Sequence, residues 1–166
     1  MDILSKNNNN NKKLLLIWLW TLLSSVFLMV IIGGITRLTD SGLSMVEWRP
    51  ILGFFPPMNE TEWHRIYDLY KSTPEYKFYN TDISLSEFKY IFFWEYFHRL
   101  WGRIIGLIFI IPFTFFLIKK ILKKREILNL IFIFALGLIQ GLIGWWMVES
   151  GLTKDPYVSQ YRLALH

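Results

Sequence analysis

Three long apolar stretches constrain the fold of this chain more than any other feature of its sequence. They run from Leu14 to Ile35, from about Ile91 to Ile118, and from Ile127 to Val148. About 20 consecutive apolar residues in a helix cross the hydrocarbon core of a bilayer, where only helices and closed barrels satisfy their backbone hydrogen bonds. The sequence therefore predicts an all-α integral membrane protein. The first stretch is too long for a cleavable signal peptide and ends on a poor cleavage site.

The distribution of charge predicts how these helices are oriented. Basic residues precede the first stretch, and the basic segment KKILKKRE, residues 119–126, connects the second stretch to the third. The connection over residues 37–89 carries more acidic than basic residues. Because short basic connections stay on the cytoplasmic or matrix side, we expect the N-terminus and residues 119–126 inside and residues 37–89 outside. The net charge of +5 therefore indicates a lipid bilayer as partner and not a nucleic acid.

The chain divides into a short tail and one membrane unit. Residues 1–13, which contain a low-complexity run of asparagine, predict a disordered tail on the inner side. Residues 14–166 predict a transmembrane helix bundle with three complete helices and the start of a fourth at residues 158–166. So short a fourth segment does not cross a bilayer. We therefore expect further chain or a partner, such as a second copy of the chain, to complete the unit.

Shorter signals lie between and within the apolar stretches. The outer loop is too long for a bare turn, which predicts structure of its own. Asn59 or Thr61 is positioned to cap a short amphipathic helix that Pro74 ends, and Ser84 with Glu87 forms a capping box. The third apolar stretch carries three glycines on one face, which predicts a seam for close helix packing. These glycines are Gly137, Gly141 and Gly144.

Four ionisable residues interrupt the second apolar stretch within the segment WEYFHRLWGR, residues 94–103. They are Glu95, His98, Arg99 and Arg103. At 100° per residue, Glu95, His98 and Arg99 share an arc of roughly 100° with Gly102, with Gly106 on the same line. Ionisable residues at membrane depth avoid lipid, so this stripe is expected to face the interior of the bundle and to be functional. The structural alternative is a Glu95–Arg99 pair that locks helices together, with His98 as a hydrogen-bonding neighbour.

A second histidine, His166, is predicted to reach the same depth as His98. Both lie on helices that descend from the outer side, about 10 Å and about 12 Å below the expected helix starts at 1.5 Å per residue. With no cysteine in the chain, metal ligands must be histidine, carboxylate or methionine. Imidazole is the usual axial ligand of heme iron, and facing helices of a bundle are where such sites are built. The sequence therefore predicts a heme between His98 and His166.

The residues around this pair suggest how a porphyrin ring would lie. Gly102 and Gly106, about one and two turns below His98, leave a flat slot on the same face. Arg162, one turn outward of His166, and Arg37, at the outer end of the first helix, are candidates to bind heme propionates. Arg99 and Arg103 lie deeper than His98 and would bind propionates only if these pointed inward. We expect the outward orientation. His64 belongs to the exposed loop helix and is excluded from the site.

Several segments resemble the N-terminal half of heme A synthase, in collinear order and with matching spacing from about Ile32 to His166. They are GGITRLTDSGLSMVEWRPILGFFPP, KSTPEYKFYN, SLSEFKYIFFWEYFHRLWGRIIGL, QGLIGWWMVESGL and VSQYRLALH. The similarity is greatest to the mitochondrial and alphaproteobacterial branch. The branch with a cysteine pair in the first outer loop is excluded because this chain has no cysteine.

The resemblance implies an eight-helix protein made of two similar four-helix halves. The N-terminal half would hold heme O, whose methyl group is oxidised through successive hydroxylations to the formyl group of heme A, and the C-terminal half would hold a heme b that relays electrons. Glu95 matches the essential carboxylate of the family, and His98 and His166 match its first histidine pair. Implied partners are heme O synthase and cytochrome oxidase assembly factors. The implied location is the mitochondrial inner membrane or the alphaproteobacterial cytoplasmic membrane.

Two other functions remain open at this point. One is a non-enzymatic bis-histidine cytochrome of the b type that only carries electrons, and the other is a transport or assembly subunit with a structural Glu95–Arg99 pair. Glu95 favours the enzyme, since an electron carrier needs no carboxylate one turn from its ligand, whereas oxidation of a porphyrin substituent requires proton handling. The half with the second histidine pair is missing, so catalysis by these 166 residues alone also stays open.

Overall fold

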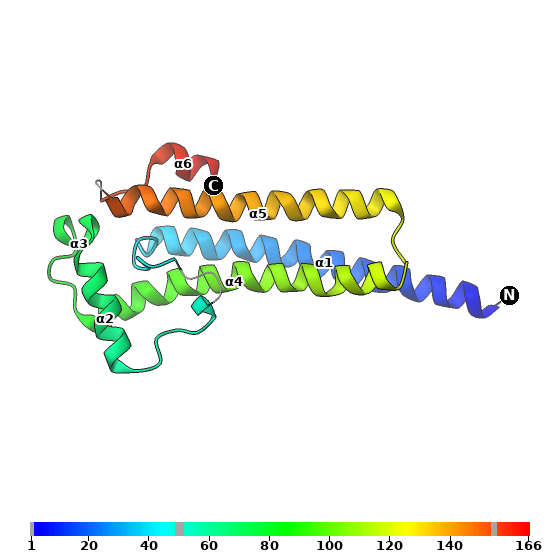
Figure 1. Cartoon of the computed structure of the whole chain (residues 1–166), viewed down its shortest axis with the longest axis horizontal. Helices are drawn as coiled ribbons and strands as arrows, with labels where there is room; N and C mark the ends of the chain where they lie inside the picture. The colour runs from blue at the N-terminus through cyan, green and yellow to red at the C-terminus, as the bar shows by residue number, and fades with distance from the viewer. Residues whose placement is uncertain (1, 49–51, 154–155) are drawn as a thin grey trace.

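The computed structural model describes residues 2–48, 52–153 and 156–166. Within these residues every regular element is a helix, as predicted (Figure 1). The elements are α1 (Asp2–Leu38), η1 (Leu52–Phe54), α2 (Glu60–Lys71), α3 (Pro74–Phe78), α4 (Leu85–Ile118), α5 (Lys124–Thr153) and α6 (Gln160–Leu165). Three of them, α1, α4 and α5, are long and apolar enough to cross a membrane. The three predicted membrane helices are therefore present.

The three long helices lie side by side, with the short elements gathered at one end (Figure 1). Helices α2 and α3 and the start of α6 lie at the end opposite to the α4–α5 connection, and α6 folds back along α5. Helix α1 packs mainly on α4. Near the α4–α5 connection, Trp18, Phe109 and Phe116 form the centre of an apolar core, and the indole of Trp18 donates to the carbonyl of Ile108 at 2.8 Å.

The starts of all four predicted helices differ from the sequence prediction, most of all those of α1 and α4; α5 begins at Lys124 and α6 at Gln160. Helix α1 continues through the segment predicted as a disordered tail and begins at Asp2; the polar segment lacks the apolar pattern from which the boundary at Leu14 was taken. Helix α4 begins at Leu85 and not near Ile91, because the capping box of Ser84 and Glu87 starts it. The Glu87 carboxylate accepts from the Ser84 backbone N–H at 2.8 Å. The cap, and not the first apolar run, therefore marks the start of α4.

The outer loop is folded, as its length predicted. Asn59 caps α2 by accepting from the backbone N–H of Glu62 at 2.8 Å, which selects it over Thr61. The loop contains one helix that the sequence analysis missed: Pro74 does not end α2 but opens α3, with Thr73 as N-cap. Pro is favoured at the first position of a helix because the missing N–H has no partner there. Arg65 of α2 forms a bidentate pair with Glu47, at 2.8 and 2.9 Å, and so ties α2 to the start of the loop.

Helix α3 carries a buried carboxyl group. Glu75 is 8% exposed and accepts a hydrogen bond from the hydroxyl of Tyr70 at 2.9 Å. The amide of Asn80 donates in turn to the Tyr70 oxygen at 2.7 Å. Burial raises the pKa of Glu75 to about 7, since a desolvated carboxylate is disfavoured relative to the neutral acid.

The raised pKa of Glu75 predicts that the free energy of unfolding falls as pH rises. The folded protein holds a proton on Glu75 that the unfolded chain releases near its ordinary pKa, so the contribution is full below about pH 4.5 and is lost as pH rises through about 7. The change is about 3 kcal/mol at most. We expect Glu75→Gln, which stays neutral, to raise Tm relative to wild type at pH 8 and not at pH 5. An unchanged difference between the two pH values would show that Glu75 titrates normally.

Candidate functional site

The polar stripe of α4 is buried where it faces the rest of the protein. Glu95 is 4% exposed, and its Oε1 lies 2.5 Å from the Nε of Arg99 one turn along the helix. Arg99 also donates through Nη2 to the carbonyl of Met45 at 3.2 Å, and its guanidinium lies 5.5 Å from the ring centre of Trp48. The loop after α1 thus covers this pair. Neutralisation by a partner and a further backbone acceptor is what a buried charge requires.

The rings of the two histidines lie close to each other. His98 of α4 and His166, which caps the C-terminus of α6, have ring centres 6.4 Å apart and ring planes at 78°. Two metal–imidazole bonds of about 2 Å each, plus the distance from each ring nitrogen to its ring centre, span a similar separation. The distance between the ring centres is thus similar to that of two imidazoles bound to one metal ion.

Contacts with α5 hold α6 and place His166. The side chain of Gln140 donates to the carbonyl of His166. Arg162 donates to the carbonyl of Trp146 at 2.7 Å and stacks on the ring of that residue. The backbone N–H of Ser159 donates to the hydroxyl of Ser150 at 2.9 Å. Helix α6 has only six residues. It depends on these contacts, because isolated helices of this length are unstable.

A glycine lies against a nitrogen-bearing edge of each histidine ring. A Cβ on Gly33 of α1 would lie 3.3 Å from Nε2 of His98, and a Cβ on Gly144 of α5 would lie 2.7 Å from Cε1 of His166. Sequence reasoning did not single out Gly33, and it predicted close packing at Gly144 without identifying His166 as the neighbour. A Cβ on Gly137 or Gly141 would meet no described atom within 4 Å, so no described element packs closely at these two positions of the predicted seam. Periodicity placed these glycines on one face but did not reveal that a side chain following α6 lies against only one of them.

The predicted slot below His98 is open on α4. A Cβ on Gly106 would meet nothing within 4 Å among the described residues, and one on Gly102 would meet only the terminal carbon of Met29, at 3.4 Å. Small residues on this face leave room beside the histidine pair. A slot for a flat ligand on this face stays a prediction, and the side chain of Met29 borders it at Gly102.

The remaining candidate residues divide into those at the site and those away from it. Arg37 pairs with Asp40 at 3.2 Å on the surface, with most of both side chains exposed. Arg103 lies with its guanidinium 5.5 Å from the ring centre of Phe54. His64 lies exposed on α2, where the sequence analysis placed it. The structure thus brings together Glu95, Arg99 and the two histidines, and it leaves Arg37 engaged elsewhere.

Some buried polar atoms of the described residues, including one in the histidine pair, have no hydrogen-bond partner. Nδ1 of His166 and Nε1 of Trp94 are buried and form no hydrogen bond with a described residue. Such atoms are rare in folded proteins, and each calls for a ligand, ion or water. In the described part of the chain no three side chains of the His, Cys, Asp or Glu type gather to bind a free ion. Two histidines alone suit a metal whose other ligands come from a macrocycle, as in heme.

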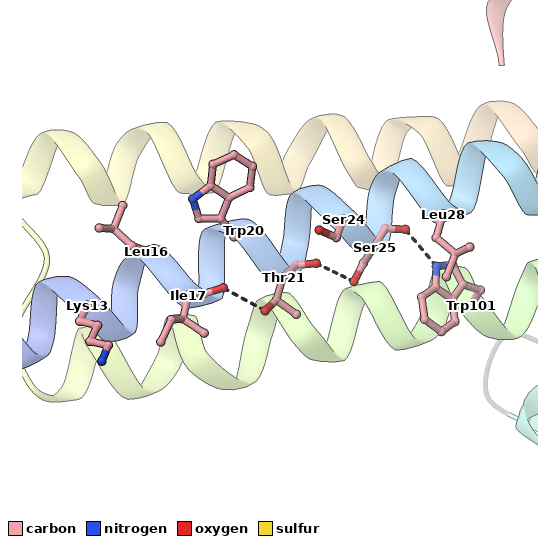
Figure 2. Close-up of a pocket in the computed structure, with 9 residues that line it drawn as sticks. All are labelled: Lys13, Leu16, Ile17, Trp20, Thr21, Ser24, Ser25, Leu28 and Trp101. Atoms are coloured by element: carbon pink, nitrogen blue, oxygen red, sulfur yellow. Dashed lines mark hydrogen bonds between the residues drawn. The ribbon is translucent and has the colours of Figure 1, made fainter.

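Two cavities among the described residues lie away from the histidines. Figure 2 shows a groove of about 590 Å³ along α1, bordered by Trp20 and, from α4, by Trp101. The indole of Trp101 donates to the carbonyl of Ser25 at 3.0 Å. A second cavity of about 310 Å³ lies beneath the outer loop, beside Arg65 and Glu47. Neither cavity is bordered by His98 or His166. The candidate site is therefore identified from the positions of the two histidine rings and from buried atoms that lack a hydrogen-bond partner.

Comparison with known proteins places this arrangement in a family. The profile of COX15-CtaA, cytochrome oxidase assembly protein, matches residues 16–166. Similar curated proteins include the heme A synthase of Nitrosospira multiformis, which is 55% identical over 150 residues, and that of Parvibaculum lavamentivorans, which is 51% identical over 149 residues. The heme A synthase of Ehrlichia canis is 53% identical over 150 residues.

The matches cover most of this chain but less than half of each relative. Each comparison spans 90% of this chain, and 42% of the Nitrosospira protein or 43% of the other two. No solved structure matches the chain significantly. The matched region includes Glu95 and both histidines, since the family profile covers residues 16–166.

Proposed function

Because the chain belongs to the COX15-CtaA family of cytochrome oxidase assembly proteins, we propose that it is the heme O-binding part of a heme A synthase, an oxidoreductase. The relatives named heme A synthase support this function. The observation that carries it is the pair of His98 and His166, with ring centres 6.4 Å apart, beside the buried carboxyl group of Glu95. In this function heme O is the substrate, and the two histidines bind its iron.

Glu95 is the group that gives the site chemistry beyond electron transfer. Bound heme supplies the iron-centred oxidation chemistry, and conversion of a methyl to a formyl group removes four electrons in total. Glu95 accepts protons released in that oxidation or stabilises positive charge on the reacting carbon. Arg99, at 2.5 Å from Glu95, fixes the direction of the carboxylate, and the carbonyl of Met45 fixes Arg99 in turn. Gly102 and Gly106 leave room for the ring.

The electrons must leave the substrate for an acceptor. The relatives are more than twice as long as this chain, and we propose that a second histidine pair in their further sequence holds a heme b that takes up the electrons. Heme O synthase and other assembly factors of cytochrome oxidase are the partners that this reaction requires before and after it.

The membrane is the bacterial cytoplasmic or mitochondrial inner membrane, with the N-terminus and the α4–α5 connection on the inner side. The basic residues of that connection, residues 119–126, support this orientation. Since the chain has no cysteine, His64→Cys introduces a single label site on the exposed face of α2. A membrane-impermeant thiol reagent is expected to label it from the outer side only, and labelling from the inner side alone would reverse the orientation.

The proposed function is tested by the pigment of the purified protein, extracted and separated by chromatography. Heme O or heme A is expected. Heme b as the only pigment would indicate the electron carrier, and protein without any heme would indicate a subunit in which Glu95 and Arg99 serve only structure.

Gly144, which lies against the ring of His166, provides a prediction with a matched control. Gly144→Ala places a Cβ 2.7 Å from Cε1 of His166, so the imidazole must move, and we expect heme retention to fall several-fold. Gly141→Ala, three residues away on α5, makes the same chemical change where a Cβ meets no described atom within 4 Å. Heme per protein after purification measures both variants. Equal retention would show that the ring of His166 does not need this space.

A further inference from the structure

One turn outward of each histidine, a side chain offers N–H groups. Trp94 lies four residues before His98 on α4, and Arg162 lies four residues before His166 at the end of α6. Four residues of helix correspond to a rise of about 6 Å and a rotation of about 40°. Figure 1 shows α4 and α6 running in the same direction along the molecule, so both residues lie on the outer side of the histidine pair.

The indole N–H of Trp94 is a buried hydrogen-bond donor without an acceptor among the described residues. Its Nε1 forms no hydrogen bond with any described residue, whereas the indoles of Trp18 and Trp101 on the long helices donate to backbone carbonyls. A buried donor without an acceptor costs about 1–3 kcal/mol. This cost is offset when an acceptor on a ligand reaches the nitrogen.

Arg162, on α6, supplies a positively charged group on the His166 side of the histidine pair. Only its Nη1 is used, at 2.7 Å from the carbonyl of Trp146, among the described residues. Its stacking on the Trp146 ring, 4.2 Å from guanidinium to ring centre, fixes the plane of the guanidinium. A fixed guanidinium with unused N–H groups is suited to bind a carboxylate.

From these positions we propose that Trp94 and Arg162 bind the two carboxylates at one edge of the tetrapyrrole, so that this edge points to the outer side of the membrane. The proposal rests on the proposed function, because it requires the ring to lie between His98 and His166. Trp94 is then a substrate-binding residue, and Arg162 has the role that its place in the sequence suggested. Arg37, which pairs with Asp40, takes no part.

The test compares two ligands that differ only in these carboxylates. Heme-depleted protein is titrated with ferric heme b and with its dimethyl ester, and the two Kd values give the preference for free carboxylates. We expect wild type to prefer the free acid at least about tenfold. Trp94→Phe and Arg162→Gln should each lower this preference by on the order of tenfold, the size of one hydrogen bond to a charged group. Binding of the ester should stay unchanged.

Trp101→Phe is the matched control, because it makes the same change on the same helix inward of His98, where the indole already has a partner (Figure 2). It should leave the preference at the wild-type value. The proposal is overturned if both Trp94→Phe and Arg162→Gln keep the full preference, or if they weaken acid and ester equally, which marks a structural role. Wild type that binds both ligands equally overturns this proposal alone. Wild type that binds neither overturns the proposed function as well.

Discussion

Replacing His98 or His166 with alanine is expected to abolish heme retention in the purified protein. Each change removes one of two protein bonds to the iron and leaves an open space between α1, α4 and α6. Changes in groups that only support metal ligands cost about 10–100-fold in metal affinity, so loss of a ligand should exceed that. The measurement is heme per protein, by absorbance of the reduced pigment, together with the amount of protein in the membrane.

His64→Ala is the control for both histidine variants. It makes the same change on the exposed helix α2, and it should retain heme like the wild type. If His98→Ala or His166→Ala also retains heme at the level of His64→Ala, the iron is bound elsewhere and the proposed site is wrong. For a variant whose protein level also falls, the amount of bound heme is compared per molecule of protein.

Replacing Glu95 with glutamine is expected to separate heme binding from oxidation. The amide keeps the size and a hydrogen-bonding capacity of the carboxyl group but carries no charge. We expect the variant to bind heme O normally and to form heme A at least roughly 100-fold more slowly, the lower range for loss of an acid–base group. Accumulation of the alcohol would show that the second oxidation step depends more strongly on Glu95 than the first does.

The structural alternative predicts a different result for the same variant. If Glu95 serves only to neutralise Arg99, the glutamine leaves a buried guanidinium without its counter-charge, and breaking such a pair costs about 3–5 kcal/mol. Protein level and heme content would then fall together with heme A. Protein, bound heme and heme A are therefore measured in one preparation, with Glu149→Gln on the exposed end of α5 as control. Normal heme A from stable Glu95→Gln protein would refute the catalytic role.

The local features of the fold were predictable because their causes are local. Hydropathy over about 20 residues identified the three long helices, and the capping box at Ser84 depends on a residue only three positions away. Helix α3 was missed because a proline after an amphipathic segment has two meanings. Pro74 was interpreted as the end of α2, whereas Thr73 as N-cap makes it the first residue of a new helix.

The site was only partly predictable, because many of its contacts join distant segments. The Glu95–Arg99 pair followed from helical spacing, whereas the depths of His98 and His166 were counted from helix starts that the structure moves to Leu85 and Gln160. The backbone acceptor for Arg99 is Met45, and no sequence pattern indicates which loop carbonyl approaches a buried guanidinium. Gly33 was missed for the same reason, since its role depends on the ring of His98 in another helix.

The position of His166 on a separate short helix has a consequence for how the protein is made. A chain inserted into the membrane from its N-terminus presents His98 on α4 long before His166 is synthesised, and domains fold as units during synthesis. A nascent protein that ends within α5 holds one imidazole and the rest of the polar stripe, but not the contacts of Gln140 and Ser150 that fasten α6. Under the proposed function, loading with a tetrapyrrole is therefore expected to follow the docking of α6 on α5, and no pigmented precursor shorter than that is expected.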